Sequence, residues 1–120
     1  MLYAMMMYET ESALAKRNDP VKSGPYWASW MAYSRAVEEA GIFVSGAGLL
    51  PPSSATTLRV SRGERRVQDG PLADSKEQLG GFFVVELPDL DAALQWAARS
   101  PAATDGAVEV RAVLPPPPKG

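Results

Sequence analysis

The chain has no cysteine and no histidine among its 120 residues. The lack of cysteine excludes disulfides, thiolate nucleophiles and cysteine-ligated zinc or iron–sulfur sites. The lack of histidine removes the commonest general base and the commonest transition-metal ligand, so neither a Ser-His-Asp nor a Cys-His mechanism can operate within this chain. Acid–base chemistry would therefore need Asp, Glu, Lys or Tyr, and we expect no metal and no cofactor.

Clustered positive charge and long apolar runs are also missing. The net charge is −2, and no group of Lys and Arg forms the basic face that a nucleic-acid partner requires. The apolar run at residues 1–8 is too short to span a membrane and lacks the charged leader and cleavage site of a signal peptide. We expect a cytoplasmic protein without a nucleic-acid or membrane partner.

The residues that are present have the composition of one ordinary globular domain, with 46% apolar and 22% charged side chains. Apolar stripes at helical spacing predict helices over 23–40 and 89–99, and a short helical turn is expected over 12–16. Gly41 is expected to end the first long helix and Pro101 the second. Apolar or alternating segments predict strands over 2–8, 42–50, 56–61, 65–68, 81–87 and 107–113.

With the hairpin at 56–68 set aside, the predicted order is βαββαβ, the ferredoxin-like arrangement of an α+β fold. Two helices would cover one face of an antiparallel sheet, whose central strands are apolar on both sides. A second copy of the chain is the economical cover for the other face, which predicts a homodimer with sheet-on-sheet contacts. Residues 1–114 would form a single domain, and 115–120 an exposed proline-rich tail.

The richest stretch of the sequence runs from Val67 to Phe82 and combines a turn signal, clustered charges and a double glycine. Asp69, Gly70 and Pro71 have the chemistry of a turn, but the Asp69 carboxylate could equally point into a pocket at a strand end, as a general base or polar anchor.

Lys76 and Glu77 form either a solvated turn or a charged group that faces Asp69 across one cleft. Gly80-Gly81 indicates a bend or a bulge, with close approach of a ligand as the alternative. The residues by themselves leave these alternatives open.

Other candidates lie at the end of the first strand and on the first long helix. Glu9 is a second carboxylate that could lie near the Asp69 loop, next to Tyr8. Trp30 belongs, with Tyr26, Trp27 and Tyr33, to an aromatic stripe that fits a core and a pocket wall, with stacking on a ligand as the alternative.

Several segments together resemble YCII-related proteins of the DGPF type. The resemblance rests on Leu2 to Glu9, Gly46-Ala-Gly-Leu-Leu-Pro51, Thr56-Thr-Leu-Arg-Val60, the helix from Asp89, Ala107-Val-Glu-Val-Arg111 and, above all, Asp69-Gly-Pro-Leu-Ala-Asp-Ser-Lys-Glu-Gln-Leu-Gly-Gly-Phe82. It covers nearly the whole chain except the tail and the segment 12–23. It implies a dimeric α+β barrel of ferredoxin-like subunits, a superfamily that includes small isomerases, dehalogenase-like enzymes and monooxygenases.

The chain departs from this family in two ways. Leu72 stands where the motif has Phe, an exchange between apolar residues that leaves packing intact. The wider YCII group is associated with a His–Asp pair, which a chain without histidine cannot form. The resemblance also implies, for some relatives, genes beside those of extracytoplasmic-function sigma factors.

Residues and resemblance together predict a small-molecule-binding barrel protein and leave open whether it is an enzyme. One hypothesis is proton-transfer chemistry of the lyase or isomerase type, carried by carboxylates. The alternative is a non-catalytic dimeric accessory or regulatory protein associated with such a sigma factor. The candidate catalytic residues are Asp69, Lys76 and Glu77, and the candidate ligand-binding residues are Tyr8, Glu9, Trp30, Gly70, Pro71 and Gly81.

Overall fold

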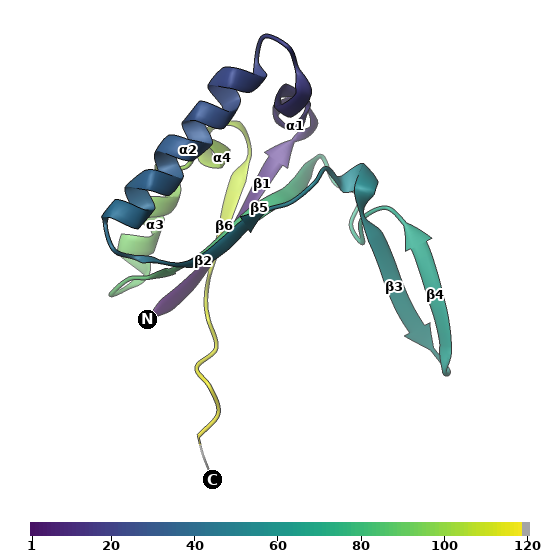
Figure 1. Ribbon diagram of the computed structural model, residues 1–120. Helices are drawn as coiled ribbons and strands as arrows, with labels where there is room; N and C mark the ends of the chain where they lie inside the picture. The colour runs from purple at the N-terminus through teal and green to yellow at the C-terminus, as the bar shows by residue number, and fades with distance from the viewer. Residues whose placement is uncertain (119–120) are drawn as a thin grey trace.

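The computed structural model describes residues 1–118, which form a four-stranded antiparallel sheet with helices on one face (Figure 1). The strands in spatial order are β2 (Phe43–Gly48), β5 (Glu77–Glu86), β1 (Leu2–Thr10) and β6 (Ala107–Ala112). This order, with every neighbouring pair antiparallel, is that of the ferredoxin-like βαββαβ connectivity. The α+β prediction is therefore confirmed.

The two long helices, α2 (Ser23–Glu39) and α3 (Leu90–Ala98), lie where the apolar spacing predicts them. Gly41 follows α2 with a φ of 73°, a left-handed conformation that glycine adopts at low cost. The Asp89 side chain accepts a hydrogen bond from the backbone of Ala92, and so satisfies one of the free N–H groups at the start of α3.

One expectation about an element boundary is wrong. Strand β5 begins at Glu77, four residues before residue 81, because residues 77–79 continue the pairing with the end of β1. Helix α3 ends before Pro101, as expected, but Pro101 also opens an unpredicted short helix, α4 (Pro101–Asp105), since proline suits the first helical turn, whose N–H groups have no partner within the helix. The helical turn expected near residues 12–16 is present as α1 (Glu11–Ala15), followed by the 3₁₀ helix η1 (Lys16–Asn18).

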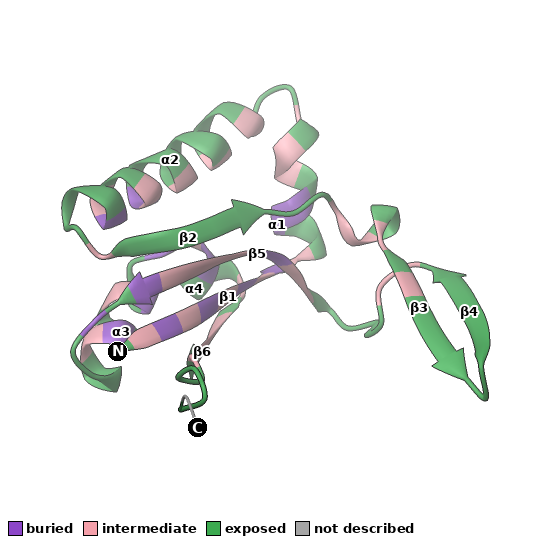
Figure 2. Ribbon diagram, turned by 60° about the horizontal axis from the view of Figure 1, so that its bottom comes forward, coloured by how far each residue is buried: buried purple, intermediate pink, exposed green. Residues whose placement is uncertain are grey.

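Strand β1 lies centrally, but it is not buried on both faces within the single chain. Tyr3, Met5 and Met7 point toward the helices and are buried, whereas the even-numbered residues from Leu2 to Thr10 are half-buried on the opposite face (Figure 2). Because all helices cover the same side, this second face stays open. The core between sheet and helices consists of Tyr3, Met5, Met7, Tyr33, Val37, Val85, Leu87, Ala93, Ala97 and Ala102.

The predicted hairpin is present as β3 (Thr56–Ser61) and β4 (Glu64–Asp69), a separate two-stranded sheet preceded by the 3₁₀ helix η2 (Pro52–Ser54). Arg62 and Gly63 link the strands, both at positive φ, which is the geometry of a type I′ turn. Figure 1 shows the hairpin projecting from the end of β2, away from the helices.

The chain beyond β6 has no regular structure over residues 113–118, and residues 115–118 are exposed. The last two residues of the expected tail, 119 and 120, lie outside the described residues. Within residues 1–118, no helix has the length and apolar character needed to cross a membrane.

Candidate functional site

Glu9, near the end of β1, is a buried carboxylate with only 3% of its surface exposed. The alternation of β1 turns it toward the helices, where an isolated charge would be costly. Two partners compensate for this burial. Arg17 of η1 donates from Nη2 to Oε2 at 2.9 Å, and the Tyr26 hydroxyl, on the first turn of α2, donates to Oε1 at 2.6 Å.

Arg17 is the centre of this cluster. Its Nε donates to the Tyr26 oxygen at 2.9 Å, its Nη2 also donates to the Gly80 carbonyl at 3.1 Å, and its Nη1 donates to the Leu49 carbonyl. The guanidinium carbon lies 5.8 Å from the ring centroid of Tyr26 and 5.4 Å from that of Trp27, within cation–π range. Each nitrogen of the guanidinium is thus already engaged by the protein, and its charge is balanced by Glu9.

Gly80 allows Glu9 and Arg17 to lie against β5. The register passes from Met7 opposite Gly81 to Tyr8 opposite Leu79, so Gly80 is the extra residue of a β-bulge. A Cβ atom at Gly80 would lie 2.2 Å from Oε2 of Glu9. The bulge predicted from the double glycine is confirmed, and what approaches Gly80 closely is the Glu9–Arg17 pair itself.

A cleft of about 470 Å³ opens beside this cluster, between α2 and the strands β2 and β5. Apolar and glycine residues dominate its lining, and Glu9, Arg17 and Tyr26 supply polar groups. Arg35 and Glu38 add one charge of each sign from α2. The remaining lining residues are Met7, Trp27, Trp30, Met31, Ser34, Phe43, Gly46, Ala47, Gly48, Gly80, Gly81, Phe82 and Phe83.

Burial, reinforced by the hydrogen bond to Glu9, raises the pKa of Tyr26 to about 12. The phenol therefore remains protonated at neutral pH, its proton directed to Glu9, and its oxygen can accept a hydrogen bond from a group in the cleft. A second cleft of about 520 Å³ lies on the other side of Glu9, Tyr26 and Trp30. The indole nitrogen of Trp30 is buried and has no hydrogen-bond partner within residues 1–118.

The structure brings three of the sequence candidates together. Glu9, Trp30 and Gly81 line the first cleft. Tyr8 lies on β1 next to Glu9, and its side chain is therefore on the opposite face of the sheet. Gly70, with a φ of 98°, accepts a hydrogen bond from Thr57, so Gly70 and Pro71 lie at the base of the hairpin, as the turn interpretation predicts.

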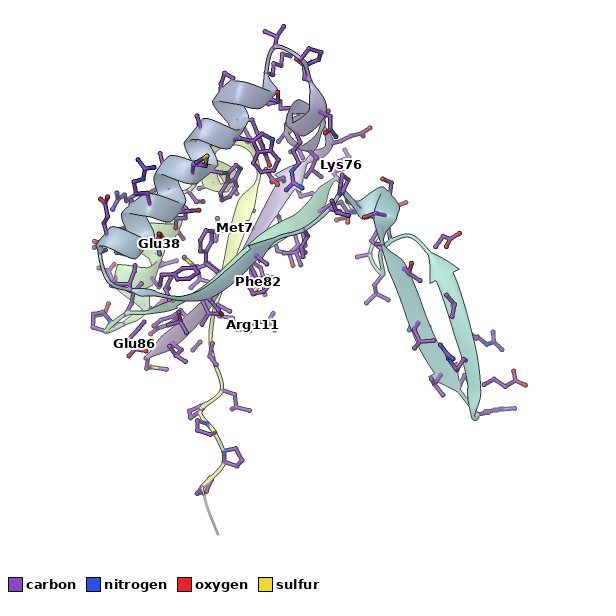
Figure 3. All side chains as sticks on the ribbon, viewed as in Figure 1. Met7, Glu38, Lys76, Phe82, Glu86 and Arg111 are labelled. Atoms are coloured by element: carbon purple, nitrogen blue, oxygen red, sulfur yellow. The ribbon has the colours of Figure 1, made fainter. Side chains whose placement is uncertain are left out.

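Asp69, Lys76 and Glu77 are exposed and are not among the residues that line either cleft. Figure 3 shows Lys76 at the start of β5, beside the hairpin base, while Met7 and Glu38 lie on the helix side of the sheet. Within the described chain, none of the three side chains forms an ion pair. Their role in binding or catalysis stays a prediction.

Sequence reasoning did not identify Arg17, and it placed Tyr26 only in a general aromatic wall. Arg17 lies in a polar segment without periodicity, and its contacts reach Leu49 and Gly80, far away in the sequence. The available signal was the double glycine, which marks a place where other groups come close to the backbone. Among residues 1–118, no three acidic side chains gather as a metal site would require.

Comparisons with known proteins agree with this fold. A family model described as the YCII-related domain matches residues 1–116. A protein of Rhizobium meliloti (strain 1021) described as uncharacterised is 41% identical over 100 residues, which cover 81% of this chain and 77% of that protein. The solved structure of 5-chloro-2-hydroxyhydroquinone dehydrochlorinase from Burkholderia phenoliruptrix AC1100, in complex with 2,5-dihydroxybenzoquinone, is similar at a TM-score of 0.55 and 17% identity. The match covers 95% of this chain and 94% of that one.

Proposed function

The chain belongs to the YCII-related family, and we propose that it binds a small planar organic molecule in the Glu9 cleft and transfers a proton there. One observation carries the proposal. The buried Glu9–Arg17–Tyr26 cluster lies beside an otherwise mainly apolar cleft of about 470 Å³. A concave apolar site with a few converging polar groups is the usual form of a small-molecule site.

The shape of the cleft supports a flat ligand. Its strand side contains Gly46, Gly48 and Gly81, which present backbone and no side chain, and its helix side carries Trp27 and Trp30. A Cβ atom added at Gly48 would meet nothing within 4 Å. A ring between a glycine surface and indoles would gain contact on both of its faces.

The charges of the cleft support a ligand without a carboxylate or phosphate. Four of the five N–H groups of Arg17 donate to protein acceptors, and its charge is balanced by Glu9, so it offers no free fork to an anionic group. The charge of Arg35 in the lining is matched by that of Glu38. Hydroxylated aromatic or quinone rings fit this environment. The ligand of the dehydrochlorinase structure, 2,5-dihydroxybenzoquinone, is of this class and is a suitable first probe.

The hydrogen bonds provide a route for a proton. Tyr26 donates to Glu9 at 2.6 Å. A ligand hydroxyl that donates to the Tyr26 oxygen could pass its proton to Tyr26 while the Tyr26 proton moves to Glu9, leaving the ligand as an oxyanion. Glu9 is then the final acceptor, and Arg17 orients it, which corresponds to carboxylate-based proton transfer of the lyase or isomerase type.

The open face of the sheet supports the homodimer as part of the same proposal. Leu2, Ala4 and Met6 of β1, with Phe82 and Val84 of β5, are apolar and only half-buried on the side away from the helices. Figure 3 shows Phe82 and Arg111 on this side of the sheet. A second copy packed face to face would remove this apolar surface from water.

Calorimetric titration with 2,5-dihydroxybenzoquinone and related phenols tests the location of the site. Gly48→Val fills open space in a strand and should weaken binding at least about tenfold, which corresponds to roughly 1.4 kcal/mol. Asp69→Asn, outside the cleft, should bind as the parent does. Loss of binding in Asp69→Asn with full binding in Gly48→Val would move the site to the Asp69 loop and refute the proposal.

The second candidate function is a non-catalytic accessory protein. The exposure of Asp69, Lys76 and Glu77 favours it, because charged groups on a protruding loop are available to a protein partner. Tyr26→Phe, which keeps the Glu9–Arg17 ion pair, separates the two functions. It removes the hydroxyl that relays the ligand's proton to Glu9, so it should abolish turnover of a ligand that the parent converts, and it should leave a purely accessory role of the exposed loop unchanged.

A further inference from the structure

The β3–β4 hairpin has one apolar face that nothing in the single chain covers. Leu58 and Val67 are directly opposite each other, and Val60 is on the same face, opposite Arg65; Thr56 and Asp69 occupy this face at the base of the hairpin. Their exposed fractions are 52%, 61% and 65%. The other face is polar and includes Arg59 and Arg66, which also form a cross-strand pair.

A hairpin of this kind needs a surface to pack on. Two strands alone are marginally stable in water. Here every residue of β3 and β4 except Thr57 is exposed (Figure 2). Two hydrogen bonds hold the base of the hairpin, but not its strands or tip. One runs from Gly70 N to Ala55 O at 2.7 Å, and the other from the Thr57 hydroxyl to Gly70 O at 2.8 Å. The apolar face of the hairpin therefore indicates a missing partner.

The direction of the hairpin indicates which partner this is. Figure 1 shows the hairpin turned to the side of the sheet opposite to α2 and α3, so that it and the open sheet face form a concave angle. A second copy packed on the open face would lie within that angle. The hairpin is then within reach of that second copy.

Charge is consistent with the same partner. Residues 56–69 contain four arginines and two carboxylates, whereas the whole chain has a net charge of −2. The hairpin is therefore positive and the rest of the chain is negative, so the hairpin of one copy attracts the body of another.

We propose that the β3–β4 hairpin is a dimerisation arm that packs its Leu58, Val60 and Val67 face onto a second copy of this chain. The inference rests on the sheet-face dimer of the proposed function and adds a second contact to it. By two-fold symmetry each copy gives one arm and receives one. The base of the arm carries Asp69, so docking also fixes the loop that the family motif marks.

The test uses three variants of the full chain. Leu58→Thr/Val60→Thr/Val67→Thr removes the apolar face while keeping β-forming residues. Ser61→Thr/Gln68→Thr makes matched exchanges on the polar face. Met6→Glu places a charge on the open sheet face. Light scattering over a concentration series measures association, and hydrogen exchange measures protection of the amides in residues 56–69.

We expect the parent to be a dimer whose hairpin amides are protected from exchange. In the triple threonine variant, the dimer dissociation constant should rise at least about tenfold, and the hairpin amides should lose their protection. The polar-face variant should match the parent. If the triple variant associates and exchanges its amides as the parent does, the hairpin is not a dimerisation arm. The same conclusion follows if a monomeric Met6→Glu variant keeps full protection of the hairpin amides. A monomeric parent would instead refute the sheet-face dimer itself, so the two failures are distinguishable.

Discussion

The Glu9–Arg17 pair should dominate the stability of the site region. In Arg17→Met, the Glu9 carboxylate, whose side chain is 4% exposed, retains only the Tyr26 hydrogen bond. An uncompensated buried charge typically costs about 3–5 kcal/mol, a large part of the 5–15 kcal/mol that stabilises an ordinary domain. Glu9→Gln should also lower the free energy of unfolding, because the Arg17 guanidinium then lacks its counter-charge.

The double variant distinguishes pairing from independent contributions. Without either charge, Glu9→Gln/Arg17→Met should be less destabilised than the sum of the single variants, by about 2 kcal/mol or more. Urea unfolding followed by tryptophan fluorescence provides the three free energies, because Trp27 lies against Arg17 and reports on this region. Additive losses, within about 0.5 kcal/mol, would show that the pair is not coupled and would refute this description of the site.

Three further predictions follow from the same contacts. Gly80→Ala places a methyl group against Oε2 of Glu9 and should destabilise the fold by about 1–3 kcal/mol in urea unfolding. Tyr26 and Tyr33 each have a pKa raised to about 12 by burial, so absorbance at 295 nm should show two late-ionising phenols. In the unfolded chain these two tyrosines ionise near pH 10, whereas in the folded protein they keep their protons up to about pH 12, so the free energy of unfolding should fall between about pH 10 and 12. An unchanged midpoint of unfolding over that range would contradict this. Asp89→Ala removes the N-cap of α3 and should lower stability by about 1 kcal/mol, measured by thermal unfolding.

The fold was predictable because its signals are local. The stripe of α2, the Gly41 terminus, the Arg62-Gly63 turn and the double-glycine bulge each follow from residues close in sequence. The start of β5 was misplaced because Glu77 and Gln78 are polar, and the strand conformation of residues 77–79 comes from pairing with β1. Tertiary contact decides such segments, and intrinsic propensity does not.

The site was less predictable because its members are distant in the sequence. The polar pattern singled out the Asp69 loop, whose charged side chains are exposed in the single chain. The clustered polar groups are Glu9, Arg17 and Tyr26, which converge because a bulge at Gly80 leaves room for them. A lone arginine in a polar segment carries no periodic signal, so its role emerges only from the packed structure.

Tryptophan indole resonances test the central claim most directly, because Trp27 and Trp30 line the Glu9 cleft and Trp96 does not. Trp96 lies on α3 beneath Arg99, whose guanidinium carbon is 4.1 Å from its ring centroid. Addition of 2,5-dihydroxybenzoquinone and a panel of uncharged hydroxylated rings should shift the indole N–H signals of Trp27 and Trp30 and leave that of Trp96 in place. Shifts confined to Trp96 or to residues of the Asp69 loop, or no shift with any member of the panel, would contradict a planar-ligand site at Glu9.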